Sequence, residues 1–153
     1  MVLTFLRNHL SVVRDTWIVG GRTGLILQGV EVEDDGEIDI CTTKEGAYAI
    51  EKILKPYQID KTNYQESPTF KAYVGKYLIN GITVEIMGDP QKLFENGEWV
   101  VIPKENVIEI EFDHQRINVF TLESELHYYQ QTSKEKPVRL LTATKILERI
   151  NKL

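Results

Sequence analysis

Three acidic side chains on strand-like segments are the residues of this chain best suited to chemistry. Glu37 and Asp39 are separated by one apolar residue, and Glu85 lies between Val84 and Ile86. Because alternate side chains of a strand share a face, Glu37 and Asp39 point the same way, and Glu85 joins them if the two strands are neighbours. Unit charges about 4 Å apart repel by about 4 kcal/mol at an effective dielectric near 20, so the group requires a cation. Carboxylates without thiolates favour Mg²⁺ or Mn²⁺.

A glycine pair stands upstream of these acids, at the end of a short apolar segment. Gly20 and Gly21 follow Val19, and a short helix closed by Gly29 is expected after them. A bend beside clustered carboxylates is what a metal-dependent phosphoryl-transfer site requires. The sequence therefore predicts such a site, built from segments far apart in the chain.

Length and composition are those of one compact domain over residues 1–153. Of the 153 residues, 42% are apolar and 27% charged, which is enough to bury a core without disulfides. The formal charge of −5 argues against broad nucleic-acid binding, which needs a basic surface. The single cysteine, Cys41, excludes an intramolecular disulfide and suits a cytoplasmic location. No apolar run reaches the ~20 residues of a membrane span.

Hydrophobic periodicity and turn residues predict the elements that position the acids. Helices are expected over about 2–13, 42–54 and 123–130 and from Pro137 to the end, and strands over 16–19, 37–41, 69–79, 82–87, 99–102, 108–112 and 117–120. Asn80-Gly81 predicts a two-residue hairpin, which fixes the register of Glu85. The polar stretch 55–68 is expected to be a loop. The predicted class is α+β, a small mixed sheet with helices chiefly on one face.

Other local signals predict where elements begin and end and which side is buried. Thr42 and Glu45 have the spacing of a capping box at the start of the central helix. Gly88-Asp89-Pro90 is expected to stop the strand that carries the third acid. The apolar face expected for the last helix consists of Leu140, Ile146, Leu147 and Ile150.

The order of these motifs resembles the nucleotidyltransferase superfamily, and most closely its small, minimal-type members. The superfamily pattern is an apolar residue and two small residues, then two acids one residue apart, then a third acid on a following strand. In this chain those positions are Val19, Gly20 and Gly21, then Glu37 and Asp39, then Glu85. The resemblance implies a polymerase-β-like fold, with a core over about 15–120 and a C-terminal helical segment over about 122–153.

The resemblance also implies a reaction. A nucleoside monophosphate is transferred from a nucleoside triphosphate, expected to be ATP, to an acceptor hydroxyl, and pyrophosphate is released. Glu37, Asp39 and Glu85 are the implied metal ligands and catalytic residues, for Mg²⁺ or Mn²⁺. Glu85 is expected to hold the ion that activates the acceptor and to receive the proton of the hydroxyl.

The implied nucleotide-binding residues surround the glycine bend. Gly20 and Gly21 let the backbone approach the phosphates, and amides at the start of the following helix point at them. Arg22 and Lys44 are the nearest cations in the sequence and are the expected charged ligands of the nucleotide.

Three functions fit these residues. The first is the enzyme, acting on a small molecule, a protein side chain or an RNA end. The second is a non-catalytic nucleotide- or protein-binding module of the same fold, such as an antitoxin or regulatory subunit, because Glu37 replaces the usual Asp and Arg22 follows the glycines. The third, a metal-dependent nuclease, leaves the glycine bend without a purpose. The acceptor and the oligomeric state stay open.

Overall fold

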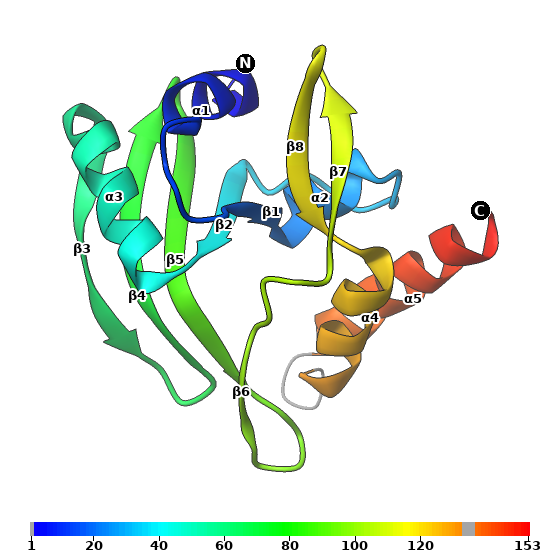
Figure 1. Cartoon of the computed structure of the whole chain (residues 1–153). Helices are drawn as coiled ribbons and strands as arrows, with labels where there is room; N and C mark the ends of the chain where they lie inside the picture. Colours follow the sequence, from blue (N-terminus) through cyan, green and yellow to red (C-terminus); the bar gives the residue numbers. More distant parts are fainter. Residues whose placement is uncertain (1, 133–136) are drawn as a thin grey trace.

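The structure is a computed structural model that describes residues 2–132 and 137–153, with helices packed around a mixed sheet (Figure 1). The helices are α1 (Val2–Leu10), α2 (Gly21–Leu27), α3 (Lys44–Leu54), the 3-10 helix η1 (Lys55–Tyr57), α4 (Leu122–Gln131) and α5 (Pro137–Asn151). The strands are β1 (Ile18–Gly20), β2 (Glu37–Thr42), β3 (Gln58–Glu66), β4 (Phe70–Ile79), β5 (Ile82–Leu93), β6 (Trp99–Val101), β7 (Val107–Phe112) and β8 (Gln115–Phe120). The predicted α+β class is confirmed. Among the described residues, no helix combines the length and the apolar character needed to cross a membrane.

Strand β2 lies in the middle of the sheet and carries two of the candidate acids. The strands follow the order β3-β4-β5-β2-β1-β8-β7, and β6 pairs with the far part of β5. β2 runs parallel to β5 and antiparallel to β1. In this register Asp39 is the partner of Glu85 on one side and of Gly20 on the other. The topology thus brings the three segments of the predicted site together.

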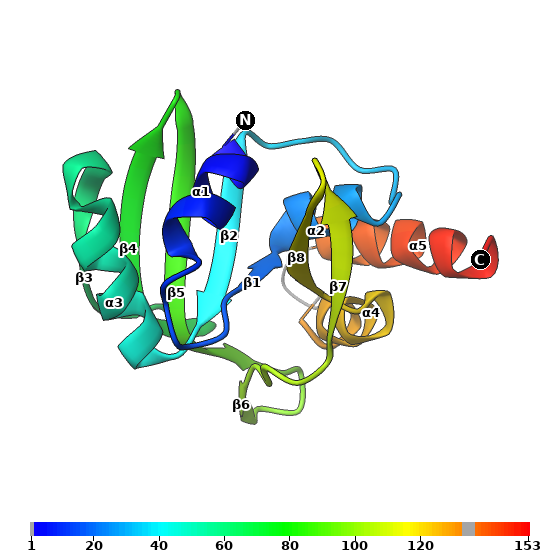
Figure 2. The same cartoon turned by 45° about the horizontal axis from the view of Figure 1, so that its top comes forward.

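The two faces of the sheet have different cover (Figures 1 and 2). α1 and α3 lie over one face, and their apolar side chains form the main core with those of β1, β2, β4, β5 and β8. On the other face a smaller cluster joins Cys41 of β2 to Phe94, Phe120 and Tyr128. In both views α4 and α5 lie together near β7 and β8. The acids are on the face that the main core does not occupy.

The predicted β4–β5 hairpin is confirmed. Ile79 pairs with Ile82 across the turn. Asn80 and Gly81 have φ of 49° and 78°, the left-handed conformation that a two-residue turn of this kind requires. The hairpin sets the position of Glu85 along β5, as the sequence predicts.

The start of α3 differs from the predicted capping box. Thr43 caps the helix, because its Oγ1 accepts a hydrogen bond from the amide of Gly46 at 2.9 Å. Thr42 is instead the last residue of β2, is fully buried, and donates its hydroxyl to the carbonyl of Thr16. Because Thr42 pairs with Gly88 of β5 as the last residue of β2, the helix begins one residue later than predicted. Glu45 is therefore not the residue paired with the cap.

The stretch predicted to be a loop, 55–68, forms η1 and the edge strand β3, so this prediction is wrong. Most β3 side chains are polar and exposed, and the strand therefore lacks the apolar alternation that sequence reasoning needs. Pairing with β4 holds it in place. A carboxylate of α3 adds to this, since Glu51 Oε2 accepts hydrogen bonds from Gln58 Nε2 at 2.7 Å and from the amide of Thr62 at 2.8 Å.

Strand β5 does not stop at Gly88-Asp89-Pro90, as predicted, but continues to Leu93. Asp89 adopts φ of 47°, and the register with β4 shifts by one residue at this point. Such a bulge tolerates proline and bends the strand without ending it. The extension pairs with β4 on one side and β6 on the other, and it carries Lys92.

Helix α5 buries only part of the face predicted for it. Ile146 is buried and Ile150 packs against the same cluster, which α5 shares with α2 and α4. Leu140 and Leu147 are 57% and 44% exposed, and Thr142 and Ala143 are buried instead. Apolar residues occur on more than one side of this helix, and the smaller side chains on the buried side permit close approach to α4.

The hydrogen bonds between Glu51 of α3 and strand β3 allow a test of how this strand is held in place. Replacing Glu51 with Ala removes the acceptor of two hydrogen bonds, and we expect a loss of about 1–2 kcal/mol in the free energy of unfolding. Urea denaturation measures the loss. The neighbouring exposed substitution Lys52→Ala should change stability by less than about 0.5 kcal/mol. Equal effects of the two substitutions would contradict the assigned role of Glu51.

Candidate active site

The three predicted acids converge on the open face of the sheet. One carboxylate oxygen from each of Glu37, Asp39 and Glu85 lies within 4.8 Å of the others. None of the three carboxylates forms an ion pair or a side-chain hydrogen bond with another residue in the described part of the chain. An unpaired group of hard oxygen donors at this spacing fits a divalent cation such as Mg²⁺ or Mn²⁺.

The electrostatics of the group indicate the same requirement. Burial, together with the charges of Glu85 and Glu37, raises the pKa of Asp39 from 3.8 to about 7. Burial is also the main cause that raises the pKa of Glu85, which Lys76 partly opposes. In the absence of a cation the folded protein therefore favours protonation of the central acid, and a bound divalent ion would reverse this preference.

The glycine bend lies directly against Asp39. Gly21 has φ of +58°, and a Cβ atom added there would lie 2.7 Å from Asp39 Oδ2. Both the backbone conformation and the close contact therefore require glycine at this position. Gly24, one turn into α2, is restricted as well, because its Cβ would lie 2.8 Å from the carbonyl oxygen of Val19. The bend thus brings the start of α2 next to the carboxylates.

The two cations predicted to bind the nucleotide, Arg22 and Lys44, do not line the cavity that lies next to Asp39 and the glycine bend. Arg22 donates from Nη1 to the carbonyl of Glu33 at 3.1 Å. Lys44 Nζ lies 4.8 Å from the centre of the Tyr73 ring. Neither side chain lines the cavity that borders Gly20 and Gly21.

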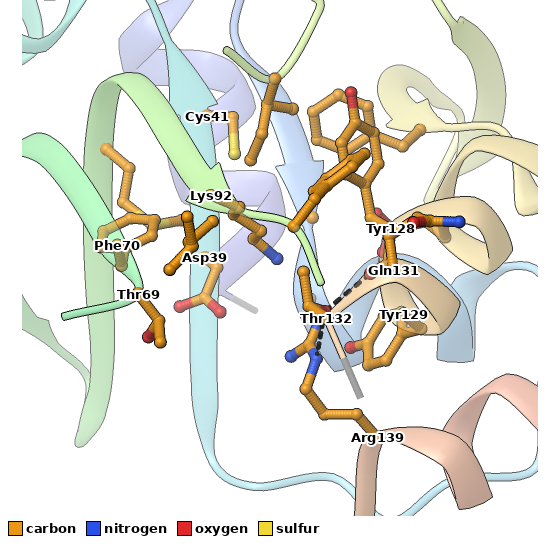
Figure 3. A pocket seen from close by; sticks show the side chains of 18 of the residues that line it. Asp39, Cys41, Thr69, Phe70, Lys92, Tyr128, Tyr129, Gln131, Thr132 and Arg139 are labelled. Carbon is orange, nitrogen blue, oxygen red and sulfur yellow. Dashed lines mark hydrogen bonds between the residues drawn. The ribbon is translucent and has the colours of Figure 1, made fainter. Parts of the chain in front are cut away.

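A cavity of about 400 Å³ begins at Asp39 and the glycine bend and extends toward α4 and α5 (Figure 3). Its apolar wall includes Phe94, Phe120 and Tyr128. Neither Glu37 nor Glu85 lines it, so the cavity adjoins only one side of the acidic group. One side of the acidic group, at Asp39, therefore faces the cavity and the C-terminal helices. The other side, at Glu37 and Glu85, faces away from the cavity.

Four charged residues of the cavity were missed in the sequence: Lys92, Glu95, Glu125 and Arg139. Burial raises the pKa of Glu125 to about 7. Burial, followed by the nearby charge of Arg139, lowers the pKa of Lys92. A signal did exist for Glu125, which follows Leu122 by one helical turn and precedes Tyr128 by another on the buried side of α4. No comparable local signal marks the two cations.

Comparison with family models and with solved structures shows to which family this chain belongs. The family model described as Aminoglycoside-2''-adenylyltransferase matches residues 2–141. The solved structure of TM1012 from Thermotoga maritima, provisionally assigned as a nucleotidyltransferase, is similar with a TM-score of 0.78 and 32% sequence identity. That match covers 99% of this chain and 92% of the other. Comparison with curated proteins gives no match.

More distant structures share the fold. The lincosamide antibiotic adenylyltransferase LnuA, solved with lincomycin, has a TM-score of 0.58 and 15% identity, with 94% of this chain and 95% of that one covered. ANT(2'')-Ia, solved in complex with adenylyl-2''-tobramycin, has a TM-score of 0.59 and 10% identity, with 98% and 90% covered. Nucleotidyl transfer is the general activity that family and fold support. The chain belongs to the aminoglycoside-2''-adenylyltransferase family and has the nucleotidyltransferase fold.

Proposed function

We propose that this protein is a divalent-metal-dependent nucleotidyltransferase that transfers AMP from ATP to a hydroxyl group of a small molecule. The observation that carries the proposal is the convergence within 4.8 Å of three carboxylates that have no ion-pair partner in the described residues, beside a glycine bend that borders a cavity. Adenylyl transfer to a small molecule is supported by the description of the family and by the antibiotic adenylyltransferases that share the fold.

Each acid has a part in this reaction. Glu37, Asp39 and Glu85 would hold the metal together. A bound divalent ion would neutralise the negative charge on the phosphoryl group that is transferred. The acceptor oxygen forms a bond to the α-phosphorus while the bond to the β-phosphate oxygen breaks, and pyrophosphate leaves with the electron pair. Glu85 takes the proton of the acceptor hydroxyl, a role suited to a carboxylate whose pKa is raised by burial.

Substitution of the central acid tests the enzymatic role. Asp39→Asn should lower the rate of pyrophosphate release by about a thousandfold, because the metal contributes several kcal/mol of transition-state stabilisation. The assay contains ATP, Mg²⁺ and a panel of hydroxyl compounds that includes lincomycin and tobramycin. Asp60→Asn, at an exposed position of β3, is the matched control and should retain full activity. Nucleotide binding by the wild-type protein without release across the panel would favour the non-catalytic module instead.

The raised pKa of Asp39 predicts that metal binding depends on pH. Because the metal needs the ionised carboxylate, the affinity for Mn²⁺ should rise about tenfold per pH unit up to about pH 7 and level off above it. Calorimetric titration of the metal-free protein between pH 5.5 and 8.5 measures this. Asp39→Asn should remove the dependence along with most of the affinity, and a flat profile in the wild-type protein would contradict the prediction.

A further inference from the structure

The cavity beside Asp39 contains two cations that come from distant parts of the chain. Lys92 lies on the extension of β5, and Arg139 lies in the first turns of α5. We infer that Lys92 and Arg139 bind the β- and γ-phosphates of the nucleotide, so that this cavity receives the leaving pyrophosphate. The inference rests on the proposed function and adds to it the direction in which the triphosphate lies.

Lys92 has no hydrogen-bond or ion-pair partner among the described residues. Its side chain extends into the cavity between Asp39 and the end of α4 (Figure 3). Its ammonium group forms no hydrogen bond or ion pair with any residue over 2–132 and 137–153. An ammonium ion surrounded by protein and left unpaired is unfavourable, which agrees with the lowered pKa of this lysine. With no partner among the residues that the structure describes, this ammonium group is suited to an anionic ligand.

Arg139 is held in place, and one of its nitrogens has no hydrogen-bond partner within the described part of the chain. Its Nε donates to Thr132 Oγ1 at 2.8 Å, and its guanidinium lies 4.2 Å from the centre of the Tyr129 ring. Its Nη2 is buried and has no hydrogen-bond partner among the described residues. A guanidinium whose Nη2 is buried without a partner in the described residues is suited to donate a hydrogen bond to a phosphate oxygen.

The two cations are close enough to repel each other, and within the described residues Asp39 and Glu125 do not form ion pairs with them. Arg139 contributes to the lowered pKa of Lys92. The charges of Glu125 and Asp39 oppose this effect, but neither acid forms an ion pair with Lys92 or Arg139 in the described residues. A closed structural ion network would show such pairs. A polyanion in the cavity would relieve the repulsion.

The position of the cavity relative to the acids assigns it to the leaving group. It adjoins Asp39 and the glycine bend, whereas Glu37 and Glu85 do not line it. A nucleotide whose α-phosphate lies at the carboxylates can therefore extend its β- and γ-phosphates toward Lys92, and the acceptor then attacks from the opposite side. When the bond to the β-phosphate breaks, the two cations neutralise the charge that develops on pyrophosphate.

Calorimetric titration of ATP and AMP in the presence of Mg²⁺ tests the inference. AMP lacks the two phosphates assigned to the cavity, so Lys92→Met should weaken ATP binding about 10- to 100-fold, the effect of one charged hydrogen bond, and leave AMP binding unchanged. Arg139→Met should act in the same direction. Lys92→Arg keeps the charge and should retain ATP binding, and Lys52→Met, on the exposed side of α3, is the charge-matched control.

Several results would overturn the inference, and they differ from a failure of the proposed function. Equal weakening of ATP and AMP by Lys92→Met would place the nucleoside in the cavity instead of the pyrophosphate. Unchanged ATP binding in that variant, or a loss caused by Lys44→Met in its place, would return the phosphates to the site predicted from the sequence. Thermal melting verifies that each variant is folded. If the wild-type protein binds neither nucleotide, the proposed function itself fails.

Discussion

Electrostatic repulsion among three carboxylates is the interaction that the rest of the site must accommodate. Glu37, Asp39 and Glu85 are held together by β2 and β5, whose hydrogen bonds and opposite apolar face fix their separation. Such a group has no stabilising role in a cation-free protein, and burial, followed by the charges of Glu85 and Glu37, raises the pKa of Asp39. The main core, formed by α1 and α3 on the other face of the sheet, offsets the repulsion and keeps the acids in position.

The site combines the acidic group with a cavity of mixed charge. The cavity beside Asp39 is lined by Lys92 and Arg139, carried by β5 and α5, and also by Glu95 and Glu125. A nucleotide bound as proposed would place its phosphates between the metal-binding acids and the two cations, which favours one orientation over the reverse.

Local patterns were informative where one residue type leaves few conformations open. Asn80-Gly81 dictated a two-residue turn, and Gly21 is required by its conformation and by its contact with Asp39. Local patterns failed where contacts with distant parts of the chain determine whether a strand forms or continues. The polar strand β3 exists because β4 and Glu51 pair with it, and β5 continues past Pro90 because a bulge lets β4 and β6 hold it.

The sequence by itself determined the class of fold, the glycine bend and the three acids, because strand alternation and the hairpin turn fix which side chains share a face. Tertiary structure alone decided which cations accompany them. Arg22 and Lys44 are near the bend in sequence but lie outside the cavity, whereas Lys92 and Arg139 line it. The physical reason is that a cavity is formed by packing between elements distant in the chain, and local periodicity holds no information about which long side chains will meet there.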